Sequence, residues 1–427
     1  MNYNHITRRD FLGKTIVAGV GMAAGLRAMN FGGLAKAAPL TTRSQVAVTQ
    51  GADHVDNIFR AMEALKSQIA AKIGNRPVLI KTNHVSGGGT PLADTPCECV
   101  EGILQFLKSI GKTDVTVAEG SIGNPPLLAF QKMGFYNLVK KYPVRFKSLS
   151  EEGYTWMKVW NWDVSQTDLV QNVRVSNMLL DKNYFVISAC RTKCHDRVIA
   201  TLSLKNIVMG SIIVDGGNFV SGSIGSSDKG NMHAAKAGDK GGINRPYGDG
   251  SHTSFNNHQD LNDTICMLSK VLAPDMSVID AYQGMQNDGP ISGNPVDPQQ
   301  TAIASLDFLS ADRVGTILMD VHNSVMTISN NITADGDTAD NSVPGGTPAT
   351  VTYNWPKYPA CLNYCAQTGV GQYDTNYIDL VGDVTSLVGL SPLVRTYALH
   401  SKTVVGQSLW MRPTPRIAPI GTDRRPA

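Results

Sequence analysis

The chain is poor in charged residues and lacks the motifs of several common enzyme classes. Of its 427 residues, 17% are charged and 42% are hydrophobic, a balance typical of a globular protein with a large core. It contains no Gly-x-Ser-x-Gly elbow, no Gly-x-x-x-x-Gly-Lys-Ser/Thr phosphate loop and no Gly-x-Gly-x-x-Gly turn after a strand. The usual hydrolase, nucleotidase and dinucleotide-binding classes are therefore disfavoured.

The N-terminus lacks the run of about 20 apolar residues that a membrane span needs, but it carries a targeting pattern. Arg8-Arg9 come before a weakly apolar stretch, and Ala35-Lys-Ala37 follows it. This arrangement is typical of a twin-arginine signal that is cleaved after Ala37. We expect the twin-arginine translocase to export the folded chain, so that it becomes periplasmic or secreted and keeps no stable membrane span. A transmembrane anchor is the alternative, which the glycines and basic residues of the stretch disfavour.

Long basic runs are missing from the rest of the chain. Residues 1–37 hold five Lys/Arg and one acid, so their removal changes the formal net charge from +3 to −1. Such a chain offers no basic patch for nucleic acid or for an anionic membrane. We therefore expect small molecules or proteins as its partners.

The seven cysteines do not form a recognisable disulfide framework, because an odd number leaves at least one cysteine unpaired. The ferredoxin spacing Cys-x2-Cys-x2-Cys is also missing, which argues against an intrinsic iron–sulfur cluster. We expect small core residues, or one disulfide, rather than metal ligands. The close pairs are Cys97/Cys99, Cys190/Cys194 and Cys361/Cys365.

Apolar runs and helical periods alternate along the first half of the chain. The patterns predict strands at residues 45–49, 78–80, 114–118, 144–149 and 184–189, and helices at residues 54–72, 95–110 and 127–141. This βαβαβ order predicts an α/β fold with a mainly parallel sheet, right-handed crossovers and helices on both faces. The pattern of residues 155–171 predicts neither a helix nor a strand.

The second half continues with longer irregular segments. A Gly/His-rich loop insertion is expected over residues 215–258, and a segment of this length is usually functional. We predict a helix at residues 258–272, a strand at 276–279, and a helix that is capped by Ser310-Ala-Asp312 and ends near Met319. A helix at 359–368 and a strand at 377–381 follow.

These elements divide the chain into a few parts. We expect a signal peptide at residues 1–37, a linker at 38–44, one α/β domain at 45–385 with a polar insertion at 323–352, and a C-terminal extension at 386–427. The extension is rich in Pro and Arg, so we expect it to be extended.

Polar residues gather where the predicted strands end. Ligands bind at the carboxyl ends of the strands in open α/β sheets, so these residues are the first candidates for a site. We expect Lys193, His195 and Asp280 to be catalytic. The expected ligand-binding residues are Lys81, Asn83, Glu119, Lys205 and Asn206.

Three lysines and two asparagines at one edge suit a small anionic ligand, a carboxylate or a phosphate. The loop at residues 86–89, Ser-Gly-Gly-Gly, would add backbone N–H groups. The alternative is a structural network in which each lysine pairs with an acid such as Glu119 or Asp280. A metal ion is a further alternative, held by His195, His233 and Asp280, with His252 and His258 nearby in sequence. Asp312 is more typical of a helix cap than of a catalyst.

Several of these stretches resemble the domain of unknown function 362 family. The resemblance extends over roughly residues 45–385, and it implies an unassigned activity. Some members carry ferredoxin-like iron–sulfur domains, which implies electron transfer or an oxidoreductase, but this chain lacks those cysteine clusters. The matching stretches are Val78–Asn83, Val117–Gly120, Lys193–His195, Thr201–Asn206, Val278–Ala281, Asn287–Pro290 and Ser310–Asp312.

Two functions remain open at this point. The first is an exported enzyme, redox-linked or not, that acts on a small anionic ligand. The second is a non-catalytic periplasmic protein that carries a ligand or metal or assists maturation. An enzyme needs a titratable pair with shifted pKa values, for example His195 against Asp280, whereas a carrier does not.

Overall fold

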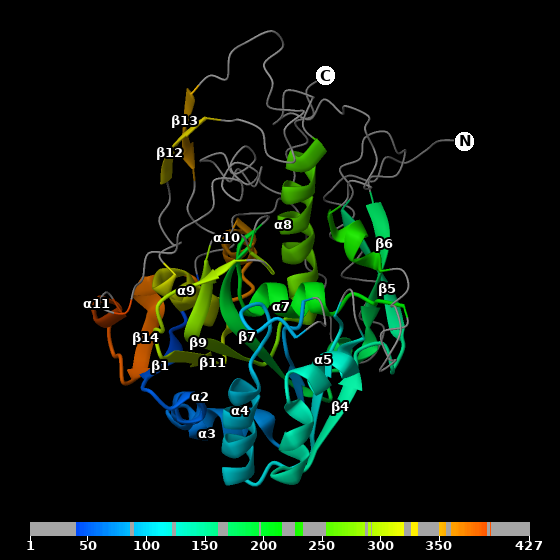
Figure 1. Cartoon of the computed structure of the whole chain (residues 1–427), viewed down its shortest axis with the longest axis vertical. Coiled ribbons are helices and arrows are strands. Elements are labelled where there is room, and N and C mark those ends of the chain that lie inside the picture. Colours follow the sequence, from blue (N-terminus) through cyan, green and yellow to red (C-terminus); the bar gives the residue numbers. More distant parts are fainter. Residues whose placement is uncertain are drawn as a thin grey trace.

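A computed structural model describes most of the chain between residues 40 and 393 (Figure 1). The expected signal, the Ser86–Gly88 part of the glycine loop, His252, and residues 287–288 lie outside the described residues. So do residues 394–427. The described ranges are 40–85, 89–121, 125–160, 170–195, 198–215, 227–233, 253–286, 289–291, 293–319, 326–331, 350–355, 360–390 and 393.

A large mixed sheet runs through the centre of the molecule. Its strand order is β14-β1-β11-β9-β7-β2-β3-β4, with β8 paired to β7 and β10 to β9. Most neighbours are parallel, but β11 runs antiparallel to both β1 and β9. The predicted α/β fold with a mainly parallel sheet is confirmed. The strands are β1 (Ser44–Gln50), β2 (Val78–Lys81), β3 (Val115–Glu119), β4 (Val144–Ser148), β7 (Phe185–His195), β8 (Ile199–Thr201), β9 (Met276–Gln286), β10 (Asn294–Pro295), β11 (Thr301–Ser305) and β14 (Ile378–Gly382).

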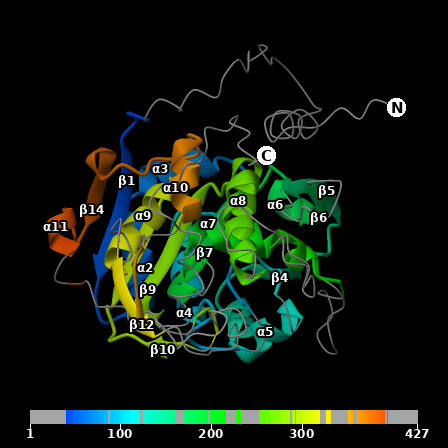
Figure 2. The same ribbon diagram turned by 90° about the horizontal axis from the view of Figure 1, so that it is seen from above.

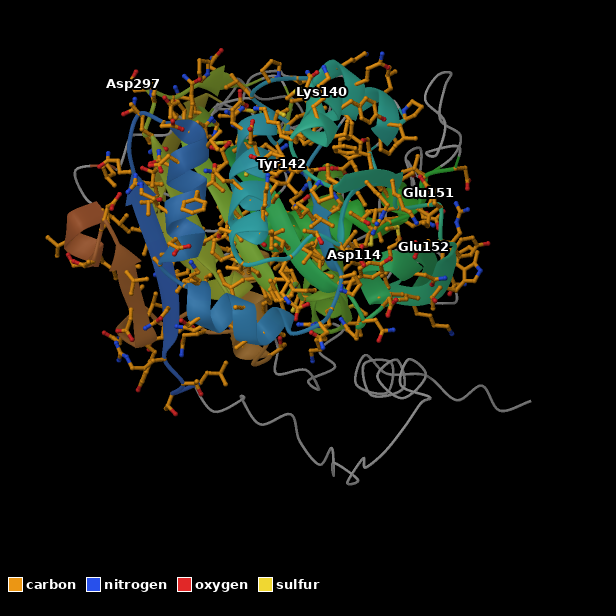
Figure 3. The ribbon with its side chains drawn as sticks, turned by 90° about the horizontal axis from the view of Figure 1, so that it is seen from below. Asp114, Lys140, Tyr142, Glu151, Glu152 and Asp297 are labelled. Carbon is orange, nitrogen blue, oxygen red and sulfur yellow. The ribbon has the colours of Figure 1, made fainter. Side chains whose placement is uncertain are left out.

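Helices cover both faces of this sheet, as the alternation predicted. One face carries α2 (His54–Glu63), α3 (Lys66–Ile73), α4 (Cys97–Ser109) and α5 (Pro126–Lys132), followed by the 3-10 helix η1 (Phe135–Lys140). The other face carries α7 (Ser203–Gly210), α8 (Thr253–Leu272), α9 (Phe308–Leu318) and α10 (Ala360–Gln367). Figure 2 looks onto α7 to α10, and Figure 3 shows α2 and α4 side by side on the opposite face.

The strands are buried on both sides, so their residues alternate between two cores. In β2, Val78 and Ile80 pack with α2 and α4, whereas Leu79 packs with the α7 to α10 layer. Lys81, the next residue, therefore points toward α7. Each fully buried aliphatic side chain contributes about 1.5–3 kcal/mol, so this pattern fixes the register of the strand and the direction of its last residue.

Smaller elements surround the sheet. Residues 155–171, which predicted no element, contribute to a hairpin of β5 (Tyr154–Trp160) and β6 (Val170–Ser176). Within the expected polar insertion, β12 (Met326–Asn331) pairs with β13 (Thr350–Trp355). The remaining short helices are α6 (Asn177–Leu180), η2 (Asp228–His233), η4 (Thr375–Tyr377) and α11 (Leu387–Leu390). No helix in the described ranges has the length and apolarity of a membrane span.

Three expectations about local structure need correction. The strand predicted to end at Ala189 continues through His195, because β8 and β9 pair with its second half. The strand predicted at 276–279 likewise runs on to Gln286, supported by β10 and β11. Helix α9 begins at Phe308, and its cap is Asp307, which accepts hydrogen bonds from the backbone N–H groups of Leu309 (3.0 Å) and Ser310 (3.1 Å). Ser310–Asp312 therefore lies inside that helix.

The cysteines are core residues, which was one of the two alternatives predicted for them; the other was one disulfide. All seven thiols are free, and six of them are buried. Burial raises the pKa of the Cys99 and Cys190 thiols well above the ordinary value. These thiols are therefore protonated and unreactive at neutral pH.

Candidate functional site

The strands β1, β2, β3, β7 and β9 all point their carboxyl ends toward the same edge of the sheet. The residues at this edge come from chain segments that are far apart in sequence. Two hydrogen-bonded clusters are found there, one beside α7 and one beside α2. The α7 side contains most of the predicted ligand-binding residues.

A buried ion pair forms the centre of the α7 side. Lys81, the last residue of β2, and Glu119, the last residue of β3, are almost completely buried, and Lys81 Nζ lies 2.6 Å from Glu119 Oε1. Burial lowers the pKa of Lys81, and Glu119 opposes this shift. Such a pair contributes little net stability, but removal of one partner leaves the other charge buried and costs about 3–5 kcal/mol.

Glu119 is held by four donors. Its Oε1 accepts hydrogen bonds from Lys81 and from the backbone N–H of Gly120 (2.7 Å). Its Oε2 accepts from Thr82 Oγ1 (3.0 Å) and from the backbone N–H of His84 (2.7 Å). Burial alone would raise the pKa of Glu119, but the charges of Lys81 and His84 and these hydrogen bonds lower it. Glu119 is therefore ionised and rigidly placed.

Two asparagines connect this pair to α7. Asn206 Oδ1 accepts from Lys81 Nζ (3.2 Å) and from Asn83 Nδ2 (3.3 Å). Asn206 Nδ2 in turn donates to the carbonyl oxygen of Lys81 (3.1 Å) and to Ser188 Oγ (3.0 Å). The structure thus brings four of the predicted residues together: Lys81, Asn83, Glu119 and Asn206.

Helix α7 approaches this pair closely at its C-terminal end. A Cβ on Gly210 would lie 2.3 Å from Lys81 Cε and 2.4 Å from Nζ. A Cβ on Gly120 would lie 2.6 Å from the carbonyl oxygen of Gly210. Only glycine fits at both positions, so the close approach belongs to the architecture of the site.

Asp312 holds the N-terminus of α7 from a different helix. Its Oδ1 accepts from the backbone N–H of Ser203 (2.8 Å) and its Oδ2 from that of Leu204 (2.9 Å). The carboxyl is fully buried, and burial raises its pKa to about 7 despite these two hydrogen bonds. Asp312 caps a helix, as predicted, but that helix is α7 and not α9.

Two further lysines lie close to this network, and neither forms a salt bridge with a described residue. Lys193 is fully buried and donates to the carbonyl oxygen of Ala93. Lys229 of η2 is half-buried and donates to the carbonyl oxygen of Gly120. Burial, together with the nearby charge of Lys205, lowers the pKa of each lysine to about 7. Glu119 and Asp94 oppose these shifts only in part.

Several polar side-chain atoms at this edge are buried and have no hydrogen-bond partner among the described residues. They include Asn83 Oδ1, His84 Nδ1, Ser121 Oγ and Arg191 Nε. His84 is enclosed edge-on by Phe130 and Phe135, and burial lowers its pKa. Buried polar groups are nearly always satisfied in native proteins, so these atoms require a water molecule, an ion or a polar ligand as their partner.

On the α2 side, Asp280 is joined to a histidine that the sequence patterns did not single out. Asp280 Oδ2 lies 3.0 Å from His54 Nε2, and Oδ1 accepts from the backbone N–H of Tyr282 (2.8 Å). Asp280 was expected to face His195 or the lysines. The strand continues past it, however, and Asp280 falls on the same side as Met276 and Val278, which pack with α2 and α4.

The other predicted residues have less defined surroundings. His195 is buried at the end of β7, and Lys205 is half-buried in the first turn of α7. The prediction that all eight residues line one cleft stays a prediction. Among the described residues, no group of three or more His, Cys, Asp or Glu lies close enough to hold a metal ion. The side chains of His233, His252 and His258 are not among those described, so the expected metal site of His195, His233 and Asp280 also stays a prediction.

Comparison with known proteins gives a family but no activity. The family model described as "Domain of unknown function (DUF362)" matches residues 78–316. No curated protein matches the chain. A crystal structure of a structural-genomics target from Thermotoga maritima is similar, with 14% sequence identity and a TM-score of 0.31. The similarity covers 61% of this chain and 58% of that one, so the chain spans less than two thirds of that protein.

Proposed function

The chain belongs to the domain of unknown function 362 family, and from that premise we propose that it is an exported enzyme that acts on a small anionic ligand. The ligand would bind at the carboxyl edge of the sheet, between α7 and the loop at residues 90–96. The residues proposed to bind it are Lys81, Asn83, Glu119, Lys193, Lys205, Asn206 and Lys229.

The observation that carries this proposal is that Lys193 is fully buried and forms no salt bridge with a described residue. A fully buried lysine is normally paired with a carboxylate, because an unpaired ammonium in the protein interior is costly. The hydrogen-bond acceptor of Lys193 is instead the carbonyl oxygen of Ala93. Lys229 likewise donates to a carbonyl oxygen, that of Gly120. An anion placed between these lysines would supply the missing counter-charge.

The rest of the edge supports a ligand of small size. Glu119 already receives four hydrogen bonds, so it neutralises Lys81 but has little capacity left for the other lysines. Asn83 Oδ1 and Ser121 Oγ remain as an acceptor and a hydroxyl for the non-ionic part of a ligand. A carboxylate or phosphate group with a polar neighbour fits this set of donors and acceptors.

Export by the twin-arginine route is the second part of the proposal. It is supported by Arg8-Arg9 and Ala35-Lys-Ala37 in the sequence. Buried free cysteines fit this route, because a protein that is exported already folded has no need of disulfides formed during folding in the periplasm.

Titration calorimetry tests the anion site, with inorganic phosphate and oxalate as probes at pH 7 in two buffers of different ionisation enthalpy. Lys193 and Lys229, with pKa values of about 7, are each roughly half protonated at this pH. Because a bound anion raises both pKa values, binding of oxalate, which is fully ionised at pH 7, should take up protons, approaching about one proton per site. Affinity should fall above pH 8, where both amines are neutral.

Two variants make this test specific. Lys193→Met should weaken binding of either probe at least tenfold, about 1.4 kcal/mol. Lys140→Met, at an exposed lysine labelled in Figure 3, should leave binding unchanged. The anion site is refuted if the wild-type protein binds neither probe at millimolar concentration, or if Lys193→Met binds them as well as the wild type does.

A further inference from the structure

We propose that His54, oriented by Asp280, is a proton-accepting residue at this sheet edge and acts on the bound ligand. The inference rests on the proposed anion site, because it assigns to that site a base on its α2 side. His54 lies before the part of the chain that the family model matches. Its partner, Asp280, is 226 residues away in sequence.

The carboxylate of Asp280 is fixed and ionised. It is fully buried, and its two oxygens accept hydrogen bonds from His54 Nε2 (3.0 Å) and from the backbone N–H of Tyr282 (2.8 Å). Burial by itself raises the pKa of Asp280, but the hydrogen bond and charge of His54 and the charge of Arg191 lower it. A buried anion in this position stabilises a positive charge on the imidazole ring.

The ring of His54 is held in one orientation. It stacks on the ring of Tyr282 with centroids 4.4 Å apart and planes at 17°. The hydroxyl of Tyr282 donates to the carbonyl oxygen of Ala52 (2.9 Å), which fixes the second ring as well. His54 is also the first residue of α2, whose N-cap Asp53 accepts from the backbone N–H of Asp56. Backbone, ring and carboxylate therefore all restrict the imidazole.

This geometry determines which nitrogen is the base. With Nε2 donating its proton to Asp280, the neutral ring carries its lone pair on Nδ1. No described residue forms a hydrogen bond with Nδ1, and 16% of the side chain is exposed. A general base needs one nitrogen that is open to the ligand, and Nδ1 of His54 meets this condition.

Arg191 connects the base to the lysines. It lies opposite Asp280 on the neighbouring strand β7. Lys193 follows two residues later, past an irregularity in the pairing of β7 with β9, and lies opposite Met285. Arg191 is buried, donates to the carbonyl oxygen of Pro91, and leaves Nε without a partner among the described residues. A small ligand that binds Lys193 through its anionic group would direct a neighbouring group toward His54.

The implied chemistry is the removal of one proton. A proton leaves an acidic O–H or C–H group of the ligand and binds to Nδ1 of neutral His54, and the bond's electron pair stays on the ligand. The imidazolium is stabilised by Asp280, and the proton returns to the product or to water. The ligand class is therefore a small organic anion with an ionisable group beside its carboxylate or phosphate. The charged and titratable groups around His54 are Asp280 and Tyr282 from β9, Arg191 from β7, and Asp53 and Asp56 from α2.

NMR titration of protein with ¹⁵N-labelled histidine tests the inference, with inorganic phosphate as the probe and His54→Gln to assign the signals. We expect the neutral ring to be the Nε2–H tautomer, and saturating phosphate to shift the ¹⁵N signal of His54 Nδ1. In Lys193→Met the phosphate effect should disappear. His54→Gln should bind phosphate with an affinity within about twofold of the wild type, because the lysines, and not the imidazole, bind the anion.

The outcomes separate the two proposals. If calorimetry shows phosphate bound but the tautomer is Nδ1–H, or the Nδ1 signal of His54 does not shift, then His54 is a structural partner of Asp280 and the inference fails alone. If no phosphate binds, the anion site fails and the inference falls with it. Asp280→Asn provides a further check, because loss of the carboxylate that accepts from Nε2 should mix the two tautomers of His54.

Discussion

Among single residues, Lys193 shows most clearly how a ligand site conflicts with stability. Its side chain is one of the largest that are fully buried in the described part of the protein, yet its ammonium has no carboxylate partner there. A site that waits for an anion must hold positive charge without compensation. We therefore expect the protein without ligand to be less stable than it would be with an apolar residue at this position.

Lys193→Met should stabilise the free protein at low pH. The pKa of Lys193 is about 7 in the folded protein and about 10.4 in the unfolded chain. Between these values the unfolded chain binds the extra proton, so this lysine makes stability rise with pH and costs most below pH 7. We expect a gain of about 1–4 kcal/mol at pH 6, net of the lost hydrogen bond to Ala93, and little gain at pH 10. Urea unfolding of wild type, Lys193→Met and Lys140→Met would measure this; a less stable Lys193→Met at pH 6 would contradict it.

The sequence could identify only some residues of the site. Lys81, Glu119 and Asn206 were predictable because the first two end short buried strands and the third belongs to a family stretch. His54 was not, because its role depends on a hydrogen bond to a residue 226 positions away. Lys229 was missed because it lies in a segment without periodicity. Asp280 was predicted as a site residue. The face of the sheet on which it lies could not be inferred, because the strand was predicted to end at Ile279, one residue before it.

At the scale of secondary structure, α7 is the element that brings the site together. It carries Lys205 and Asn206, and its C-terminal Gly210 contacts Lys81. Its sequence provides no cap of its own, since the N-cap residue is Leu202. Asp312 supplies that cap from α9, and Ser203 Oγ is hydrogen-bonded to Ser277 Oγ of β9. Sequence patterns identify a capping residue directly before the helix that it caps. A cap supplied by a residue of a different helix could therefore not be predicted.

Asp312→Ala should therefore affect both stability and binding. It removes two hydrogen bonds to buried N–H groups, which should cost about 2 kcal/mol, and by loosening α7 it should weaken phosphate binding severalfold. Asp312→Asn keeps one acceptor and should lie between the two. Asp307→Ala is the matched control: it removes the cap of α9 and should destabilise the protein to a similar degree without weakening phosphate binding. Equal loss of phosphate affinity in both Ala variants would show that Asp312 has no special effect on the site.

The same carboxyl gives a pH signature. Its pKa of about 7 in the folded protein exceeds the unfolded value of about 3.9, so the folded state binds the extra proton between these pH values. The stability that Asp312 provides is present below about pH 4 and falls as the pH rises toward 7. The difference between wild type and Asp312→Asn, measured by urea unfolding from pH 4 to 8, should change in this direction.

For the whole molecule, fold class and cysteine use were predictable, since both follow from patterns that extend over many residues. The alternation of strands and helices gave the mainly parallel sheet, although the reversed strand β11 at its centre was not foreseen. The chain turns back after β9 through β10, which pairs antiparallel with β9, and β11 keeps this reversed direction. The odd cysteine count excluded a complete disulfide framework, and the structure has seven free thiols.

A chain with this cysteine pattern should be exported in the folded state. Six thiols are buried, and Cys97 is only partly exposed, with burial raising its pKa to about 12. A chain that crossed the membrane unfolded would present these thiols to periplasmic oxidants, whereas a folded chain protects them. Replacement of Arg8-Arg9 by Lys-Lys should keep the protein in the cytoplasm with residues 1–37 attached. The wild-type protein, recovered from the periplasm and starting at Ala38, should show seven thiols by Ellman titration after denaturation under anaerobic conditions. Export and trimming of the Lys-Lys variant, or a periplasmic protein with fewer than seven thiols, would exclude the twin-arginine route as argued from these residues.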